Sequence, residues 1–234
     1  MAFHSRYKEA LSLSGRVDRE PNATRLHQVI QRVDARQGLD ACEAGGYALI
    51  GFSCDEGVRR NHGRVGAAEG PDALRRCLAG LPYAGQRPVY DLGSVICAGE
   101  DLEGAQAALG ELVAAARAAR LLPIVLGGGH ETAWGHYLGL RPGSDSIGML
   151  NFDAHFDLRE LGEEGGTSGT PFLQIANDCH ERHRPFQYCC IGIQHMGNTQ
   201  ALFQRAEVLK TEVILADEII LQGSPALYPR IDRF

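Results

Sequence analysis

Short apolar runs alternate with amphipathic stretches along most of the chain. Apolar runs bounded by glycine, proline or charged residues are typical of buried strands, and they occupy residues 47–52, 88–93, 121–126, 146–152, 188–193 and 213–216. Apolar residues at helical spacing predict helices over residues 23–35, 71–78, 102–122, 131–140 and 171–177. Two further helices are predicted, one that ends at residue 209 and one that begins at residue 225. Because strands alternate with helices, we expect an α/β fold of three layers, with a mainly parallel sheet between two layers of helices.

The first 44 residues depart from this alternation because they are polar and rich in Ser, Arg, Asp and Gln. We expect residues 1–44 to form an N-terminal surface segment, with no chemistry of its own. Residues 45–234 are expected to form the α/β domain on which it packs.

Polar residues directly follow one of the apolar runs, in the segment Asp153-Ala154-His155-Phe156-Asp157. If the extended backbone continues through it, Asp153, His155 and Asp157 project to the same side. Carboxylate oxygens and an imidazole nitrogen suit Mn²⁺, Zn²⁺ or Fe²⁺, and Mn²⁺ is favoured where carboxylates dominate. The alternative is a strand that runs out into a solvated loop, where Asp is common.

A second candidate ligand follows the preceding strand. Gly127, Gly128 and Gly129 come directly after the apolar run 121–126 and precede His130. Glycines allow a sharp turn, and ligands of open parallel sheets gather at the carboxyl ends of the strands. Two consecutive strands that each end in donor residues therefore predict a metal centre.

A long, charged and glycine-rich loop follows the first strand, over residues 54–71. It carries Arg59, Arg60 and Arg64, whose guanidinium groups could bind a carboxylate in bidentate geometry. Long loops at strand ends are usually functional or disordered, so a solvated run of charges is the alternative for each arginine.

Composition narrows the class of protein. The chain has 234 residues, 44% of them hydrophobic, which is enough for one sizeable domain. The net charge of −6 argues against nucleic acid as the main partner, and no apolar run approaches the ~20 residues of a membrane span. The seven cysteines form no C-x-x-C pair, and the N-terminus lacks a signal-peptide core, which together predict a cytoplasmic protein with reduced thiols.

A nucleotide-binding domain is weakly supported. The sequence has no G-x-x-x-x-G-K-[ST] motif, and Thr132 stands where a G-x-G-x-x-G fingerprint starting at Gly127 needs its third glycine. We expect Trp134 and Tyr137 to pack in the fold, and His195, near a predicted strand end, stays a candidate site residue.

Taken together, the segments 127–131 and 153–157 resemble the first two metal motifs of the ureohydrolase family, which includes arginase, agmatinase and formimidoylglutamase. Residues 57–75 resemble the family's N-terminal active-site loop and the helix after it, and residues 168–172 resemble the block downstream of the second motif. The resemblance runs from about residue 47 onward. It implies an arginase-like fold, two Mn²⁺ ions per complete subunit and a homo-oligomer.

Two further stretches, residues 55–61 and 192–199, resemble formimidoylglutamase, and Ser168 stands where arginases and agmatinases carry a histidine. This resemblance implies hydrolysis of N-formimidoyl-L-glutamate to L-glutamate and formamide, a step of histidine degradation. The residues that it suggests for binding this anionic substrate are Arg59, Arg60, Asn61, Arg64, Ser168 and Asn198. The alternative is another ureohydrolase that acts on a guanidino substrate.

The resemblance also assigns the metal ligands. His130 and Asp157 would bind one Mn²⁺, His155 would bind the other, and Asp153 would bridge both. The ions are expected to activate water for attack on the formimidoyl carbon, and the proton donor to the leaving nitrogen stays open.

The family's third metal motif, Ser-x-Asp-x-Asp, does not occur in these 234 residues. We therefore expect a chain truncated at its C-terminal side, which alone binds metal weakly and hydrolyses poorly. A non-catalytic relative that keeps the fold is the competing hypothesis, although nothing about packing requires the alternation of Asp and His at 153–157.

Overall fold

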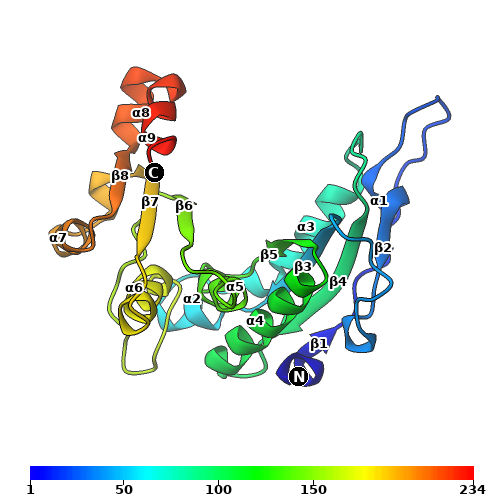
Figure 1. Ribbon diagram of the computed structural model, residues 1–234, viewed down its shortest axis with the longest axis horizontal. Coiled ribbons are helices and arrows are strands. Elements are labelled where there is room, and N and C mark those ends of the chain that lie inside the picture. The colour runs from blue at the N-terminus through cyan, green and yellow to red at the C-terminus, as the bar shows by residue number, and fades with distance from the viewer. The chain divides into compact units, whose positions relative to one another are not determined.

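Strands alternate with helices along the chain and most strand pairs are parallel, which confirms the predicted α/β class (Figure 1). The computed structural model describes residues 1–234, apart from the side chain of Ala226. The chain divides into two compact units, Met1–Pro142 and Gly143–Phe234, and each unit has its own sheet. Among the described residues, no helix combines the length and the apolar character that a membrane crossing requires.

The sheet of the first unit is built on two long apolar strands, β3 (Tyr47–Ser53) and β4 (Val89–Ile96), which pair in parallel. Nearly all their residues are buried, as is typical of parallel strands covered on both faces. In addition, β5 (Leu122–Leu126) pairs in parallel with β3, and β2 (Ile30–Arg32) in parallel with β4. The short β1 (Tyr7–Lys8) pairs antiparallel with β4.

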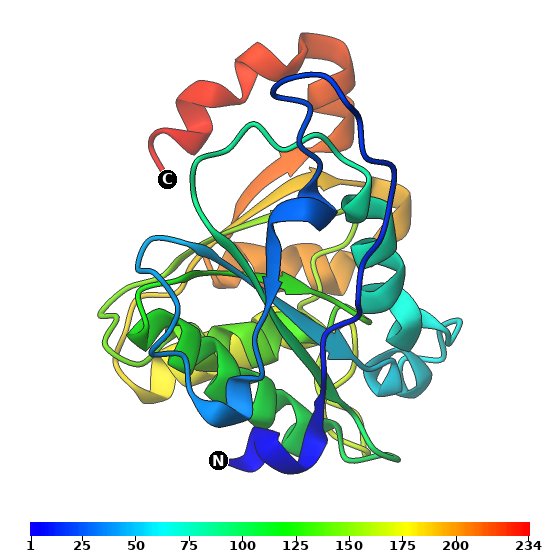
Figure 2. The ribbon, with the colours of Figure 1, turned by 90° about the vertical axis from the view of Figure 1, so that its right-hand side faces the viewer.

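The helices of this unit are α1 (Leu26–Val29), α2 (Glu56–Arg60), α3 (Gly70–Ala79), α4 (Leu102–Ala118) and α5 (Thr132–Leu140), with the 3₁₀ helices η1 (Ala2–Arg6), η2 (Ala35–Gln37) and η3 (Ala67–Glu69). The longest, α4, begins where Asp101 Oδ1 accepts a hydrogen bond from Gly104 N at 3.0 Å, a typical N-cap. It lies beside α5 (Figure 1) and beside η1 (Figure 2). In α5, Trp134 stacks on the buried Tyr137, with ring centroids 5.7 Å apart.

The helix predicted over residues 23–35 is wrong. Only α1 is helical there, and Ile30 already has an extended backbone as the chain enters β2. Ile30 pairs with Val89 of β4, so a tertiary contact decides the conformation of a β-branched residue that fits both patterns. Residues 1–44 thus contribute β1 and β2 to the sheet, and Phe3, only 1% exposed, joins the core.

A buried ion pair ties α3 to β4. The side chains of Arg75 and Asp91 are each 1% exposed, and two guanidinium nitrogens donate to the two carboxylate oxygens at 2.7 and 2.8 Å. Two further Arg75 donors reach Ser94 Oγ and Gly93 O, both at 2.8 Å, and Nη1 also lies 3.5 Å from Asp72 Oδ1. Glycine is needed at position 51 because a Cβ there would lie 2.8 Å from Arg75 Nη1 and closer still to Ser94 Oγ.

The second unit holds a parallel sheet in the order β6 (Gly148–Phe152), β7 (Gln187–Ile193), β8 (Glu212–Leu215). Its helices are α6 (Pro171–Glu181), α7 (Gln200–Val208), α8 (Ala216–Gln222) and α9 (Tyr228–Ile231), with the 3₁₀ helices η4 (His195–Gly197) and η5 (Ser224–Ala226). The strand predicted to end at Ala216 ends at Leu215 instead, because α8 begins at the next residue.

Thiol accessibility gives a first test of this fold. We expect Cys77, which is exposed, to react fastest with an aromatic disulfide reagent under native conditions. Cys54, Cys179, Cys189 and Cys190 are buried and should react only on unfolding. Burial also raises the pKa of the Cys190 thiol to about 12, which keeps it protonated. The substitution Cys77→Ser should abolish the fast phase of absorbance change; if that phase persists, the fast thiol lies elsewhere.

Candidate metal centre

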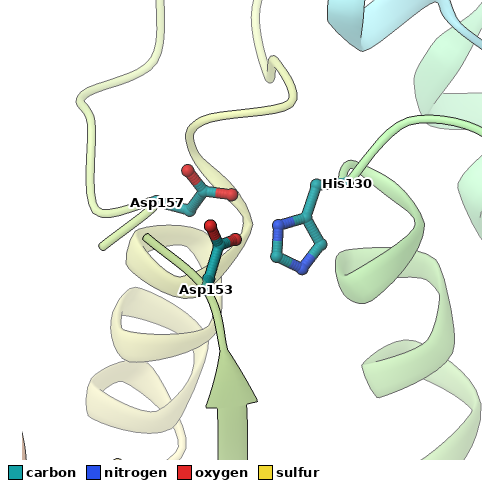
Figure 3. A group of neighbouring side chains, drawn as sticks. All are labelled: His130, Asp153 and Asp157. Atoms are coloured by element: carbon teal, nitrogen blue, oxygen red, sulfur yellow. The ribbon is translucent and has the colours of Figure 1, made fainter. Parts of the chain in front are cut away.

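The glycine turn after β5 depends on a close approach of two backbones. A Cβ on Gly128 would lie 1.9 Å from Cys54 O, and Gly129 N donates to the same oxygen at 2.9 Å. Only glycine fits this contact, so the run of glycines fixes where the chain turns. The turn delivers His130 two residues before α5 begins, and Figure 3 shows its imidazole projecting from this turn.

Glu131, which was not among the predicted site residues, holds the same turn from inside the first unit. Its side chain is fully buried, and Oε1 accepts hydrogen bonds from Gly57 N at 3.0 Å and from Cys54 Sγ at 3.6 Å. Burial raises the pKa of the Glu131 carboxyl. The sequence did carry a signal for this role, because Glu131 is a charged residue that directly follows the glycines and the candidate ligand His130.

The expectation that an extended backbone continues through 153–157 is wrong. β6 ends at Phe152, and Asp157 has a positive φ of 48°, which is incompatible with a strand. Asp153 Oδ1 accepts a hydrogen bond from His155 N at 3.0 Å, so the aspartate side chain competes with the sheet for the backbone. The segment is therefore a turn, which we call the acidic turn, residues 153–157.

The acidic turn still brings its two carboxylates together. Asp153 and Asp157 each offer an oxygen within 4.8 Å of the other, and Figure 3 shows both side chains leaving the backbone beyond the end of β6. His155 Nδ1 lies 3.6 Å from Asp153 Oδ1, and the His155 side chain is 56% exposed. Two ionised carboxylates this close repel one another, and a divalent cation between them removes the repulsion. The donor set of the turn therefore fits a metal ion.

The predicted arginines have different surroundings. Arg59 donates to both oxygens of Glu56, at 2.7 Å each, and its side chain is 41% exposed. Arg60 is only 6% exposed and contacts Glu56 at 2.9 Å and Glu103 at 2.6 Å. Its guanidinium is therefore engaged in ion pairs within the first unit, whereas Arg64 is exposed. Both Arg59 and Arg60 belong to α2, a helix inside the stretch predicted to be a loop.

The other predicted substrate residues are half-buried. Asn61 follows α2, and its backbone N donates to Gly57 O at 3.1 Å. Ser168 lies in a turn closed by Gly169 N donating to Thr167 Oγ1 at 3.1 Å, just before α6. Asn198 follows η4, and its amide contacts the acidic turn. His195, in η4, stacks on Phe203 with ring centroids 5.1 Å apart.

Comparison with known proteins gives a consistent result. Residues 46–234 match the arginase family. The formimidoylglutamase of Chromobacterium violaceum is 53% identical over 203 residues, which cover 85% of this chain and 63% of that protein. The formimidoylglutamase of Ralstonia nicotianae is 46% identical over 229 residues, covering 94% of this chain and 69% of that protein.

Solved structures agree on the fold. Formiminoglutamase of Trypanosoma cruzi, crystallised with Mn²⁺, aligns with a TM-score of 0.68 at 27% identity, over 77% of this chain and 63% of that chain. Formimidoylglutamase of Bacillus subtilis aligns with a TM-score of 0.76 over 94% of this chain and 67% of that chain, and at 21% identity supports the fold alone. The chain thus spans 63% to 69% of the lengths of these relatives.

Proposed function

This chain belongs to the arginase family, and we propose that it is a manganese-dependent hydrolase that cleaves N-formimidoyl-L-glutamate to L-glutamate and formamide. The observation that carries the proposal is the 53% identity to a formimidoylglutamase over 203 residues, a stretch that contains most of this chain. The manganese assignment is supported by the carboxylates of the acidic turn and by the Mn²⁺ in the T. cruzi formiminoglutamase crystal.

The proposed metal ligands are those implied by the family resemblance. His130 and Asp157 would hold one ion, His155 would hold the second, and Asp153 would contribute to both. A bound divalent metal supplies Lewis acidity and lowers the pKa of water to near neutrality. The contribution of the chain itself is to fix these donors: the turn at residues 127–129 sets the position of His130, and the acidic turn sets those of Asp153, His155 and Asp157.

The substrate is an anion, and the proposed contacts follow from the exposure of the candidate side chains. Arg59 is a candidate carboxylate ligand because its side chain is 41% exposed, and the substrate would share its guanidinium with Glu56, to which Nε and Nη2 already donate. Arg64 is exposed and can share this role, with Asn61 and Ser168 as neutral hydrogen-bonding groups. The buried Arg60 instead positions α2 through its ion pairs with Glu56 and Glu103.

Two broader properties are part of the same proposal. All seven cysteines are free thiols, which supports a reducing cytoplasmic location. The family resemblance supports a homo-oligomer.

Product identification tests the proposal. The purified chain is stripped of metal, reloaded with Mn²⁺, and incubated with N-formimidoyl-L-glutamate while products are followed by NMR. We expect formamide and glutamate to appear in equal amounts, at a low rate because the third metal motif of the family does not occur in these 234 residues, and we expect chelation to stop their formation. Urea released from arginine, agmatine or a guanidino acid would instead indicate the alternative function, another ureohydrolase that acts on a guanidino substrate. Mn²⁺ binding without any product would leave the non-catalytic relative as the better description.

A further inference from the structure

The amide side chain of Asn198 is committed to the backbone of the acidic turn. Its Nδ2 donates to Ala154 O at 2.8 Å, and its Oδ1 accepts from Phe156 N at 3.1 Å. The second Nδ2 hydrogen bond goes to Gln194 O, also at 2.8 Å. We propose that Asn198 is a positioning residue that fixes the acidic turn for metal binding, and not a substrate contact. This inference rests on the metal site of the proposed function.

The hydrogen-bonding capacity of the amide supports this role. A primary amide carries two N–H donors, and both N–H groups of Asn198 already have carbonyl acceptors within the second unit. A substrate carboxylate would need one of these two N–H groups. Either Ala154 O in the acidic turn or Gln194 O, directly after β7, would then lose its hydrogen bond from Asn198.

A second side chain binds the backbone of the same residue, Phe156. Tyr188, in β7 and 1% exposed, donates its hydroxyl hydrogen to Phe156 O at 3.0 Å and accepts from Asn151 Nδ2 at 3.0 Å. Its ring stacks on Phe172 of α6, with centroids 4.2 Å apart. Both backbone groups of Phe156, which lies between the two last donors of the turn, are therefore bound by side chains.

These hydrogen bonds matter because the acidic turn contains a backbone conformation of high free energy. Asp157 sits at φ = 48°, in the left-handed region of the backbone, which a non-glycine residue adopts only at a cost in free energy. Gln194 N also donates to Ala154 O, at 3.1 Å, so this carbonyl is held twice. When such supports of metal ligands are removed, metal affinity typically falls about 10–100-fold.

Two substitutions test the role of the clamp, the name we give to the side chains of Asn198 and Tyr188 that bind the backbone of the acidic turn. Asn198→Ala removes all three hydrogen bonds, and Tyr188→Phe removes only the hydroxyl, so it serves if the first variant does not fold. Asp101→Ala is the control, because it also removes local side-chain contacts, the N-cap of α4 and the ion pair with Arg6, but in the first unit. Amide hydrogen exchange of residues 153–158 is measured on the metal-free proteins, and Mn²⁺ affinity by calorimetry. At saturating Mn²⁺, KM and kcat are then measured for N-formimidoyl-L-glutamate.

We expect both clamp variants to exchange faster at 153–158 and to bind Mn²⁺ about 10–100-fold more weakly, with KM unchanged at saturating Mn²⁺. Asp101→Ala should lose thermal stability and change neither local exchange nor affinity. A raised KM with unchanged Mn²⁺ affinity would assign Asn198 to the substrate and overturn the inference. Unchanged exchange at 153–158 would overturn it as well. A parent chain without Mn²⁺ affinity would overturn the proposed function, while the exchange data would still decide whether Asn198 fixes the turn.

Discussion

Replacing Asp153 by asparagine is expected to weaken Mn²⁺ binding by more than about 100-fold and to reduce turnover at fixed Mn²⁺ by at least as much, since loss of a direct ligand should exceed the loss of a supporting group. The asparagine keeps an Oδ1 that can accept the hydrogen bond from His155 N, so the turn should persist. The expected loss comes from the missing negative charge beside Asp157. Calorimetric titration with Mn²⁺ measures the affinity, and product formation measures the turnover.

Asp145→Asn provides the matched control for this experiment. Asp145 is exposed in the same unit and loses the same charge on substitution. We expect its Mn²⁺ affinity to match that of the parent chain. Equal losses in the two variants would indicate a nonspecific effect of net charge, and an unchanged affinity in Asp153→Asn would remove Asp153 from the ligand set.

The substitution Arg75→Met is expected to lower the free energy of unfolding of the first unit by about 3–5 kcal/mol, the range found when one partner of a buried ion pair is removed. The carboxyl group of Asp91, 1% exposed, would lose its bidentate partner and stay buried. Urea denaturation followed by far-ultraviolet circular dichroism measures the change as a shift in the transition midpoint.

Two further variants distinguish the effect of breaking a buried ion pair on stability from the effect of removing any arginine. Arg36→Met removes an arginine that is 38% exposed and paired with Asp34, and exposed pairs contribute about 0–1 kcal/mol. Replacing Arg75 and Asp91 together by Met and Leu should recover part of the lost stability, because no buried charge is then left alone. If Arg75→Met is no more destabilising than Arg36→Met, the buried pair does not support the fold as described.

The parts of the fold that could be predicted from sequence are those whose signal is local. β3 and β7 are continuous apolar runs, and α4 follows the capping residue Asp101 with an alanine-rich pattern. β2 could not be predicted, because Ile30 has an apolar spacing that suits a helix and its strand partner Val89 is remote in the chain. α2 was missed because it has only five residues, three of them charged, and it is held by ion pairs from Arg59 and Arg60 to its own Glu56.

The candidate site also has one part that the local sequence predicts and another part that depends on tertiary contacts. The proximity of Asp153 and Asp157 was predicted, although through a strand geometry that the turn replaces. Nothing local in the sequence indicates that Asn198 and Tyr188 bind the backbone of Phe156, because these hydrogen bonds join residues brought together only by the fold of β7 and η4. The ligand roles of the four metal residues remain a prediction.

The single tryptophan of the chain gives the fold a built-in optical reporter. Trp134 lies in α5 against Tyr137, so its emission senses the first unit, while Gly143–Phe234 contains no indole. Circular dichroism averages over both units. Emission and ellipticity that change at different urea concentrations would therefore show that the two units melt as separate cooperative blocks, and coincident curves would show a single one.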